Sequence, residues 1–182
     1  MLRLFAIKNT LFDDDAEFEK NLALIDGERR QKVNSLTLRE KKNECLAAGI
    51  ILPLALKACG YSGEVRIEKG EWNKPVLVQP KNLFFNLSHS GEWTVIALSG
   101  KEVGVDVQQI KPADMRLARR FFTREEAKAI ENAPDPDKLF YRIWTAKEAY
   151  LKAIGTGLNR PLNSIDVHVG ESVITVTDPQ LG

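Results

Sequence analysis

The stretch WTAKEAYLKAIGTGL, residues 144–158, has the pattern of a helix that ends at a glycine. Glu148 and Lys152 are four residues apart, so one turn of helix places both side chains on the same face. Such a pair is either a salt bridge that stabilises the helix by about 0.2–0.5 kcal/mol or an acid and a base that work together in an active site. The helix alone leaves both interpretations open.

Around this helix, the C-terminal half alternates between helices and strands. The sequence TREE at 123–126 is a capping box, with Thr123 as the N-cap and Glu126 three residues later. It predicts a short helix from Thr123, after one at 116–122 and before the long helix at 138–154. Alternating apolar residues predict one strand before these helices and two strands after them, at 103–108, 164–169 and 172–177.

The N-terminal half has a similar order of elements. We predict a strand at 1–7, a basic helix at 28–34, and a long helix that begins with Thr37 in the capping box TLRE and ends at Gly60. Gly91 lies in the turn of a predicted hairpin. The strands predicted after the long helix lie at 64–68, 83–89 and 93–99.

The two halves also share short sequences. The matching pairs are RRQKVNSLTLREKK at 29–42 with ARRFFTREEAKA at 118–129, and LKACG at 56–60 with LKAIG at 151–155. We interpret them as an internal duplication: an α+β fold of two similar α+β halves, residues 1–100 and 101–182, with the chemistry in the second half. Superposing the helix ends places Pro53 where the second half has Glu148, so the first half would lack that carboxylate.

The composition excludes several classes of function. The net charge of +1 over 182 residues gives no overall field to attract nucleic acid or a membrane surface. The longest apolar run, CLAAGIILPLAL at 45–56, is too short to span a bilayer. Cys45 and Cys59 form no CxxC pair and are expected to be free thiols in a reducing compartment. We therefore expect a cytoplasmic protein that binds neither nucleic acid nor membrane.

Two oxygen-bearing side chains lie in the sequence GVDVQ at 104–108. Side chains alternate along a strand, so Asp106 and Gln108 would share a face while Val105 and Val107 point the other way. Oxygen ligands without paired cysteine or histidine suit a hard cation such as Mg²⁺. The alternative is an edge strand with its polar side chains in solvent.

Two further groups are candidate functional residues. His89 ends a predicted strand among Asn86, Ser88 and Ser90, although a lone histidine is more often structural. Arg29 and Lys32 belong to a compact basic cluster, for which the alternative is a solvated helix face.

Taken together, these motifs resemble a known family. In order, they are NKPVL at 73–77, FNLSHSGEWTVIAL at 85–98, GVDVQQIKP at 104–112, RRFFTREE at 119–126 and WTAKEAYLKAIGTGL at 144–158. Each motif alone is unspecific, but all of them in this order resemble the 4′-phosphopantetheinyl transferase superfamily, in its surfactin-synthetase-activating type. The resemblance implies a monomer of two similar halves with coenzyme A between them. It also implies transfer of the 4′-phosphopantetheine arm of coenzyme A to a serine of an acyl or peptidyl carrier protein, releasing adenosine 3′,5′-bisphosphate.

The resemblance also implies roles for individual residues. The matching positions are Asp106 and Glu148 for Mg²⁺, with Mn²⁺ as an alternative; Lys152 beside the pyrophosphate; and Lys74, Ser88, His89, Arg29 and Lys32 for the coenzyme. Asp106, Glu148 and Lys152 would then be the catalytic group. Glu148 would take the proton of the carrier serine, and Lys152 would stabilise the departing bisphosphate.

One position departs from the family pattern. Many bacterial members have glutamate where this chain has Gln108, whose amide oxygen can bind Mg²⁺ but brings no charge. Two alternatives therefore stay open: a coenzyme A-binding module with weakened catalysis that is associated with a synthase, and a Mg²⁺-dependent nucleotide hydrolase. The sequence does not choose between carrier proteins of fatty acid, polyketide and peptide synthesis.

Overall fold

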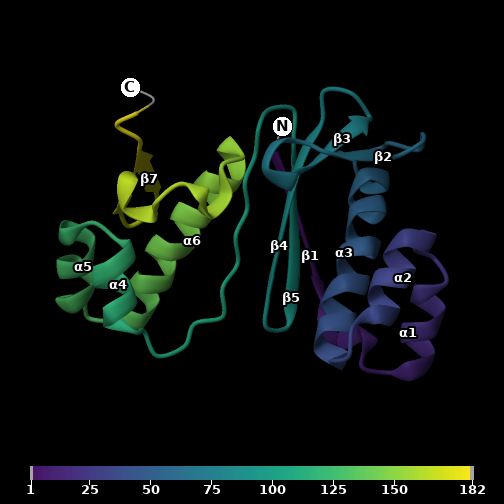
Figure 1. The fold of residues 1–182 in the computed structure, drawn as a ribbon, viewed down its shortest axis with the longest axis horizontal. Coiled ribbons are helices and arrows are strands. Elements are labelled where there is room, and N and C mark those ends of the chain that lie inside the picture. Colours follow the sequence, from purple (N-terminus) through teal and green to yellow (C-terminus); the bar gives the residue numbers. More distant parts are fainter. Residues whose placement is uncertain (1, 181–182) are drawn as a thin grey trace.

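The computed structural model describes residues 2–180, which form a mixed α+β fold (Figure 1). The helices are α1 (Asp15–Leu22), α2 (Gly27–Ser35), α3 (Arg39–Ala58), α4 (Met115–Phe121), α5 (Arg124–Glu131) and α6 (Pro136–Ile154). The strands are β1 (Leu2–Lys8), β2 (Arg66–Lys69), β3 (Pro75–Gln79), β4 (Phe84–Ser90), β5 (Trp93–Ser99), β6 (Asp166–Val169) and β7 (Ile174–Thr177). The predicted α+β class is thus confirmed. None of these helices is long and apolar enough to cross a membrane.

An antiparallel sheet with strand order β1-β5-β4 forms the centre of the N-terminal half. Alternate residues of β5, Ile96 and Leu98, are almost fully buried and pack against Ile51 and Leu56 of α3. The apolar stripe of α3 therefore covers one face of the sheet, as Figure 1 shows. The predicted β4–β5 hairpin is confirmed, and Gly91 in its turn has a positive φ of 56°.

In the C-terminal half, α6 packs against α5 and the β6–β7 hairpin. Phe122, Phe140 and Ile143 form the centre of this core. The capping box at Thr123 is confirmed, because Thr123 and Glu126 exchange side chain to backbone hydrogen bonds. At its other end, α6 stops at Gly155, whose φ of 79° is the left-handed conformation that glycine adopts without strain.

The connection between the halves is a long extended segment, residues 100–114. Figure 1 shows it passing between the central sheet and the C-terminal helices. The strand predicted at 103–108 is wrong, because this segment makes no backbone ladder. Its amides at Val105, Val107 and Gln109 instead donate to the side chains of Asn86 (2.9 Å), Ser88 (3.4 Å) and Ser90 (3.0 Å) of β4. Polar side chains thus replace the carbonyl acceptors that a neighbouring strand would supply.

Other predictions were wrong in detail. The predicted capping box at Thr37 does not form: α3 begins at Arg39, and Leu38 precedes it without a side-chain cap. The guanidinium of Arg39 instead donates to the carbonyl of Phe12, which fixes the start of the helix. No strand was predicted at β3. Cys45 and Cys59 are free thiols, as expected.

The two halves differ in their sheets. Within residues 2–180, the N-terminal half has a three-stranded and a two-stranded sheet, whereas the C-terminal half has one two-stranded sheet. Both halves place a long helix against their strands. The pseudo-symmetric duplication, and the division into 1–100 and 101–182, stay predictions.

Candidate active site

A close contact between the connecting segment and α6 forms the first part of the site. A Cβ atom on Gly104 would lie 1.8 Å from the carbonyl oxygen of Ala149 and 2.6 Å from the amide nitrogen of Ala153. Glycine is therefore the only residue that lets the segment lie this close to the backbone of α6. This contact brings Asp106, two residues further on, to Lys152 of α6.

The carboxylate of Asp106 accepts several hydrogen bonds, and its side chain is only 2% exposed. Its Oδ1 accepts from Lys152 Nζ at 2.6 Å and from Ser88 Oγ at 2.7 Å. Its Oδ2 accepts from Gln108 Nε2 at 3.3 Å. The salt bridge between Glu148 and Lys152, one of the two interpretations of the helix, does not form, because Lys152 pairs with Asp106 instead.

Glu148 lies one helical turn before Lys152 and is half-buried. Within the described part of the chain, its carboxylate has no hydrogen bond or ion pair. Burial raises the pKa of Glu148, and the negative charge of Asp106 raises it further, while Lys152 lowers it. A half-buried carboxylate that faces a second carboxylate and lacks a partner is suited to a positively charged ligand.

The oxygen atoms of these side chains are suited to bind a hard cation with modest affinity. Asp106 and Glu148 supply carboxylate oxygens, and Gln108 supplies an amide oxygen, which are the ligand types that Mg²⁺ binds. No cluster of three or more histidine, cysteine, aspartate or glutamate side chains occurs among residues 2–180, so the site has fewer charges than a three-carboxylate site. Gln108 turns its Nε2 toward Asp106 and accepts from Ser90 Oγ at 3.4 Å through its Oε1, so its amide must rotate before it can bind a cation.

The second part of the site is a pocket of about 500 Å³ between α2, α3, β3 and β4. Arg29, Lys32 and His89 line it, so the structure brings together these three predicted coenzyme residues. Its apolar lining comes from Leu36, Cys45, Ala48, Leu52, Ile67, Pro75, Phe85 and Leu87. Basic groups beside an apolar surface are suited to a ligand that joins a phosphate to a flat ring.

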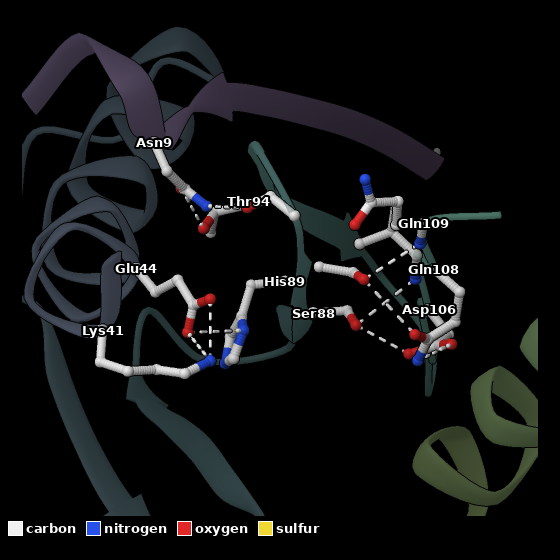
Figure 2. Close-up of polar contacts among 12 residues, drawn as sticks. Asn9, Lys41, Glu44, Ser88, His89, Thr94, Asp106, Gln108 and Gln109 are labelled. Carbon is white, nitrogen blue, oxygen red and sulfur yellow. Dashed lines mark hydrogen bonds and ion pairs between the residues drawn. The ribbon is translucent and has the colours of Figure 1, made fainter. Parts of the chain in front are cut away.

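Strand β4 contributes to both parts of the site, because its side chains alternate. Figure 2 shows Ser88 pointing toward Asp106 and its neighbour His89 pointing toward α3. There, His89 Nδ1 lies 3.3 Å from Glu44 Oε2, and Glu44 also pairs with Lys41 at 2.8 Å. Glu44 and Lys41 line the pocket as well, and neither was among the predicted site residues. Ser88 therefore contacts Asp106, whereas His89 lines the pocket.

Lys74 has a different position from the other predicted coenzyme contacts. Its Nζ donates to the carbonyl oxygen of Ala153 at 2.8 Å and to Glu102 at 2.8 Å. It thus satisfies a carbonyl in the last turn of α6. The neighbouring Pro75, and not Lys74, lines the pocket. The sequence offered no sign of this contact, because residues 74 and 153 are far apart along the chain.

Comparison with known proteins shows which family the chain belongs to. The sequence model of the 4′-phosphopantetheinyl transferase superfamily matches residues 102–178, which include the whole of α6. A 4′-phosphopantetheinyl transferase of Bacillus subtilis is 31% identical over 158 residues, covering 84% of this chain and 70% of that protein. The chain belongs to the 4′-phosphopantetheinyl transferase superfamily. The Sfp transferase of Bacillus subtilis strain 168 is 30% identical over 159 residues, covering 84% of this chain and 70% of Sfp. A Bacillus pumilus transferase is 32% identical over 162 residues, covering 88% of this chain and 64% of that protein.

Membership of the transferase superfamily agrees with the expectation from the sequence motifs. The matched region contains the carboxylate cluster, with Asp106, Gln108, Glu148 and Lys152. The pocket residues Arg29, Lys32 and His89 lie before it. The family model therefore matches the C-terminal part of the chain, and the alignments with whole transferases extend the likeness to most of the chain.

Proposed function

We propose that this chain transfers the 4′-phosphopantetheine arm of coenzyme A to a serine hydroxyl of an acyl or peptidyl carrier protein, releasing adenosine 3′,5′-bisphosphate. One observation carries the proposal: Asp106, Glu148 and Lys152 converge beside a pocket with basic groups and an apolar lining. The region that contains these three residues matches the superfamily model, and the relatives that align with most of the chain are transferases. The reaction needs these two parts, one for the nucleotide and one for the phosphoryl group.

The pocket would hold the nucleotide end of coenzyme A. Arg29 and Lys32 supply positive charge for a phosphate, and His89 can donate a hydrogen bond from the floor at β4. Leu52 and Phe85 offer apolar surface to the adenine ring. Ser88 lies next to His89 in β4, and its side chain points to the opposite face of the strand, toward Asp106. A coenzyme that lies across the end of β4 would therefore present its pyrophosphate to the carboxylate cluster.

Asp106, Glu148 and Gln108 would hold Mg²⁺, or Mn²⁺ in its place. The ion supplies positive charge to the pyrophosphate oxygens, which gain negative charge as the phosphorus–oxygen bond to the bisphosphate breaks. Asp106 is held in position by Ser88, which donates to it, and by the close contact at Gly104. This rigidity places one ligand before the coenzyme arrives.

Glu148 is suited to accept the proton of the carrier serine. Its carboxylate lies close to the other proposed ligand, Asp106, and in the protein without metal burial and the charge of Asp106 raise its pKa. The serine oxygen then attacks the phosphorus of the phosphopantetheine arm, and the bisphosphate leaves. Lys152 supplies the positive charge, and a donated hydrogen bond, for the departing oxygen.

One assay tests this proposal against its alternatives. The chain is incubated with coenzyme A, Mg²⁺ and an apo carrier protein, and the mass of the carrier is then measured. A carrier heavier by one phosphopantetheine group supports the transferase. Tight coenzyme binding with an unchanged carrier indicates a binding module, and free phosphopantetheine without a carrier indicates a hydrolase.

Several features of the protein stay predictions from its sequence. They are a monomeric state, a cytoplasmic location and the absence of nucleic acid and membrane from its partners. The choice among fatty acid, polyketide and peptide carriers is decided by the same assay with one carrier of each kind.

A further inference from the structure

Asp106 is surrounded by donors from its own chain. Its Oδ1 accepts from both Lys152 Nζ (2.6 Å) and Ser88 Oγ (2.7 Å), which use both lone pairs of this oxygen. Its Oδ2 accepts from Gln108 Nε2 at 3.3 Å. Only one lone pair of the carboxylate therefore remains for any other ligand.

Lys152 is equally well satisfied. Its ammonium donates to Asp106 Oδ1, to Ser88 Oγ at 3.0 Å and to the carbonyl oxygen of Val105 at 3.3 Å, so each of its three hydrogens has an acceptor. The side chain is 26% exposed, which leaves its flexible stem a route to solvent and to a ligand. The ammonium thus lies in a small cage of oxygen atoms, as a bound cation would.

This arrangement has to change before a divalent cation can bind Asp106. A cation on Asp106 would lie close to the Lys152 ammonium, and the two positive charges would repel each other in a half-buried site. The amide of Gln108, which now turns its nitrogen toward Asp106, would also have to rotate. The described contacts are therefore those of a site already filled by a positive charge from the protein.

We propose that Lys152 is a built-in counter-cation, which holds Asp106 in the metal-free protein and leaves it for the coenzyme pyrophosphate when a divalent cation binds. This inference rests on the proposed function. It explains how one lysine serves two positions: it stabilises a nearly buried carboxylate before the metal arrives, and it faces the phosphates only afterwards. Metal and lysine thus compete for Asp106 in the free protein and cooperate once coenzyme A is bound.

The test measures the binding of Mn²⁺ to the protein without coenzyme. The electron paramagnetic resonance signal of free Mn²⁺ reports how much of the ion stays unbound. Lys152→Met should bind Mn²⁺ at least ~5-fold more tightly than the wild type, because a neighbouring positive charge is gone. With saturating coenzyme A this advantage should disappear or reverse, since the wild-type lysine then lies on the pyrophosphate. Lys138→Met, which removes an exposed lysine from the same helix, should leave the Mn²⁺ affinity unchanged.

Two points keep this test decisive. If Lys152→Met does not fold, because Asp106 is left without its partner, Lys152→Gln retains hydrogen bonding and gives the same comparison. Equal or weaker Mn²⁺ binding by the variant without coenzyme overturns the inference, and so does the absence of measurable binding in both proteins. The carrier-mass assay is independent of this result, so a failed transfer with the expected Mn²⁺ data would reject the proposed function alone.

Discussion

Two lysines of α6, five residues apart, each pair with a carboxylate from another part of the chain. Lys147 pairs with Glu126 at 2.9 Å, and Lys152 pairs with Asp106 at 2.6 Å. The first pair is 0% and 5% exposed, and the lysine also donates to the carbonyls of Leu162 and Ile165. Glu126 accepts from the amides of Thr123 and Val167 as well, so α5, α6 and β6 are joined through one buried group.

The second pair, Lys152 with Asp106, is partly exposed to solvent, whereas the first pair, Lys147 with Glu126, is buried. We call them the open pair and the closed pair. Lys152 is 26% exposed, and Glu148 beside it has no partner within the described residues. Burial lowers the pKa of Lys147, which Glu126 opposes, and the charges of that pair are balanced within the core. At the second pair one negative charge is left over. The comparison indicates that a balanced pair stabilises the fold, whereas an unbalanced one is available for a ligand.

The largest expected effect comes from removing a carboxylate of the open pair. Asp106→Ala and Glu148→Ala should each lower the rate of transfer by roughly 100- to 1,000-fold or more, because each removes charge that acts on the reacting phosphate. Circular dichroism should show folded proteins. Glu125→Ala removes an exposed carboxylate of α5 and should keep the wild-type rate. Near-normal turnover of Glu148→Ala at saturating Mg²⁺ would mean that α6 does not carry the chemistry.

Breaking the closed pair should instead affect stability. Lys147→Met leaves Glu126 charged and without its lysine in the core, so the free energy of unfolding should fall by about 3–5 kcal/mol. Urea denaturation measures this loss, and Lys138→Met on the same helix is the control. The folded fraction should still lose less activity than Glu148→Ala does. A stable Lys147→Met protein with no activity would place Lys147 in the reaction and remove the contrast between the pairs.

The sequence predicted the start of α5 and the end of α6 better than it predicted the contacts of α6. Local signals set the capping box at Thr123 and the stop at Gly155, and both are confirmed because they depend on neighbours a few residues away. The partner of Lys152 was not predictable in this way. Asp106 is 46 residues distant, and the contact depends on Gly104 lying against the backbone of α6.

The wrong strand at 103–108 has the same origin. Alternating apolar and polar residues correctly predicted an extended segment, but periodicity does not say whether the acceptors are backbone carbonyls or side chains. Here Asn86, Ser88 and Ser90 supply the acceptors from every second position of β4. The sequence indicated Asn86, Ser88 and Ser90 only as polar neighbours of His89.

A smaller change should sharpen the account of the open pair. Gln108→Glu adds a negative ligand, so the Mg²⁺ concentration for half-maximal transfer should fall by roughly 3- to 10-fold. A Mg²⁺ titration of the initial rate measures it. Gln109→Glu adds the same charge at the next, exposed residue, whose side chain lies against Gly91, and should have much less effect. An unchanged or higher Mg²⁺ requirement in Gln108→Glu would indicate that residue 108 does not contact the metal.

The smallest expected effect is on the stability of the metal-free protein. Folding raises the pKa of Glu148 above its ordinary value of 4.5, chiefly through burial. A raised carboxyl pKa contributes stability below the ordinary value, and this contribution is lost as the pH rises through the folded value. At neutral pH the wild type therefore carries an unfavourable half-buried charge. Glu148→Gln should raise the free energy of unfolding there and should have no effect below pH 4.5.

Urea denaturation at several pH values, with a chelator present, measures this difference between Glu148→Gln and the wild type. Saturating Mg²⁺ should reverse its sign at neutral pH, because the wild type gains a carboxylate–metal contact and the variant does not. Glu125→Gln, at an exposed position, should show neither effect. If Glu148→Gln raised the free energy of unfolding equally at every pH, the gain would come from packing. The unpaired negative charge would then not be the difference between the open pair and the closed pair.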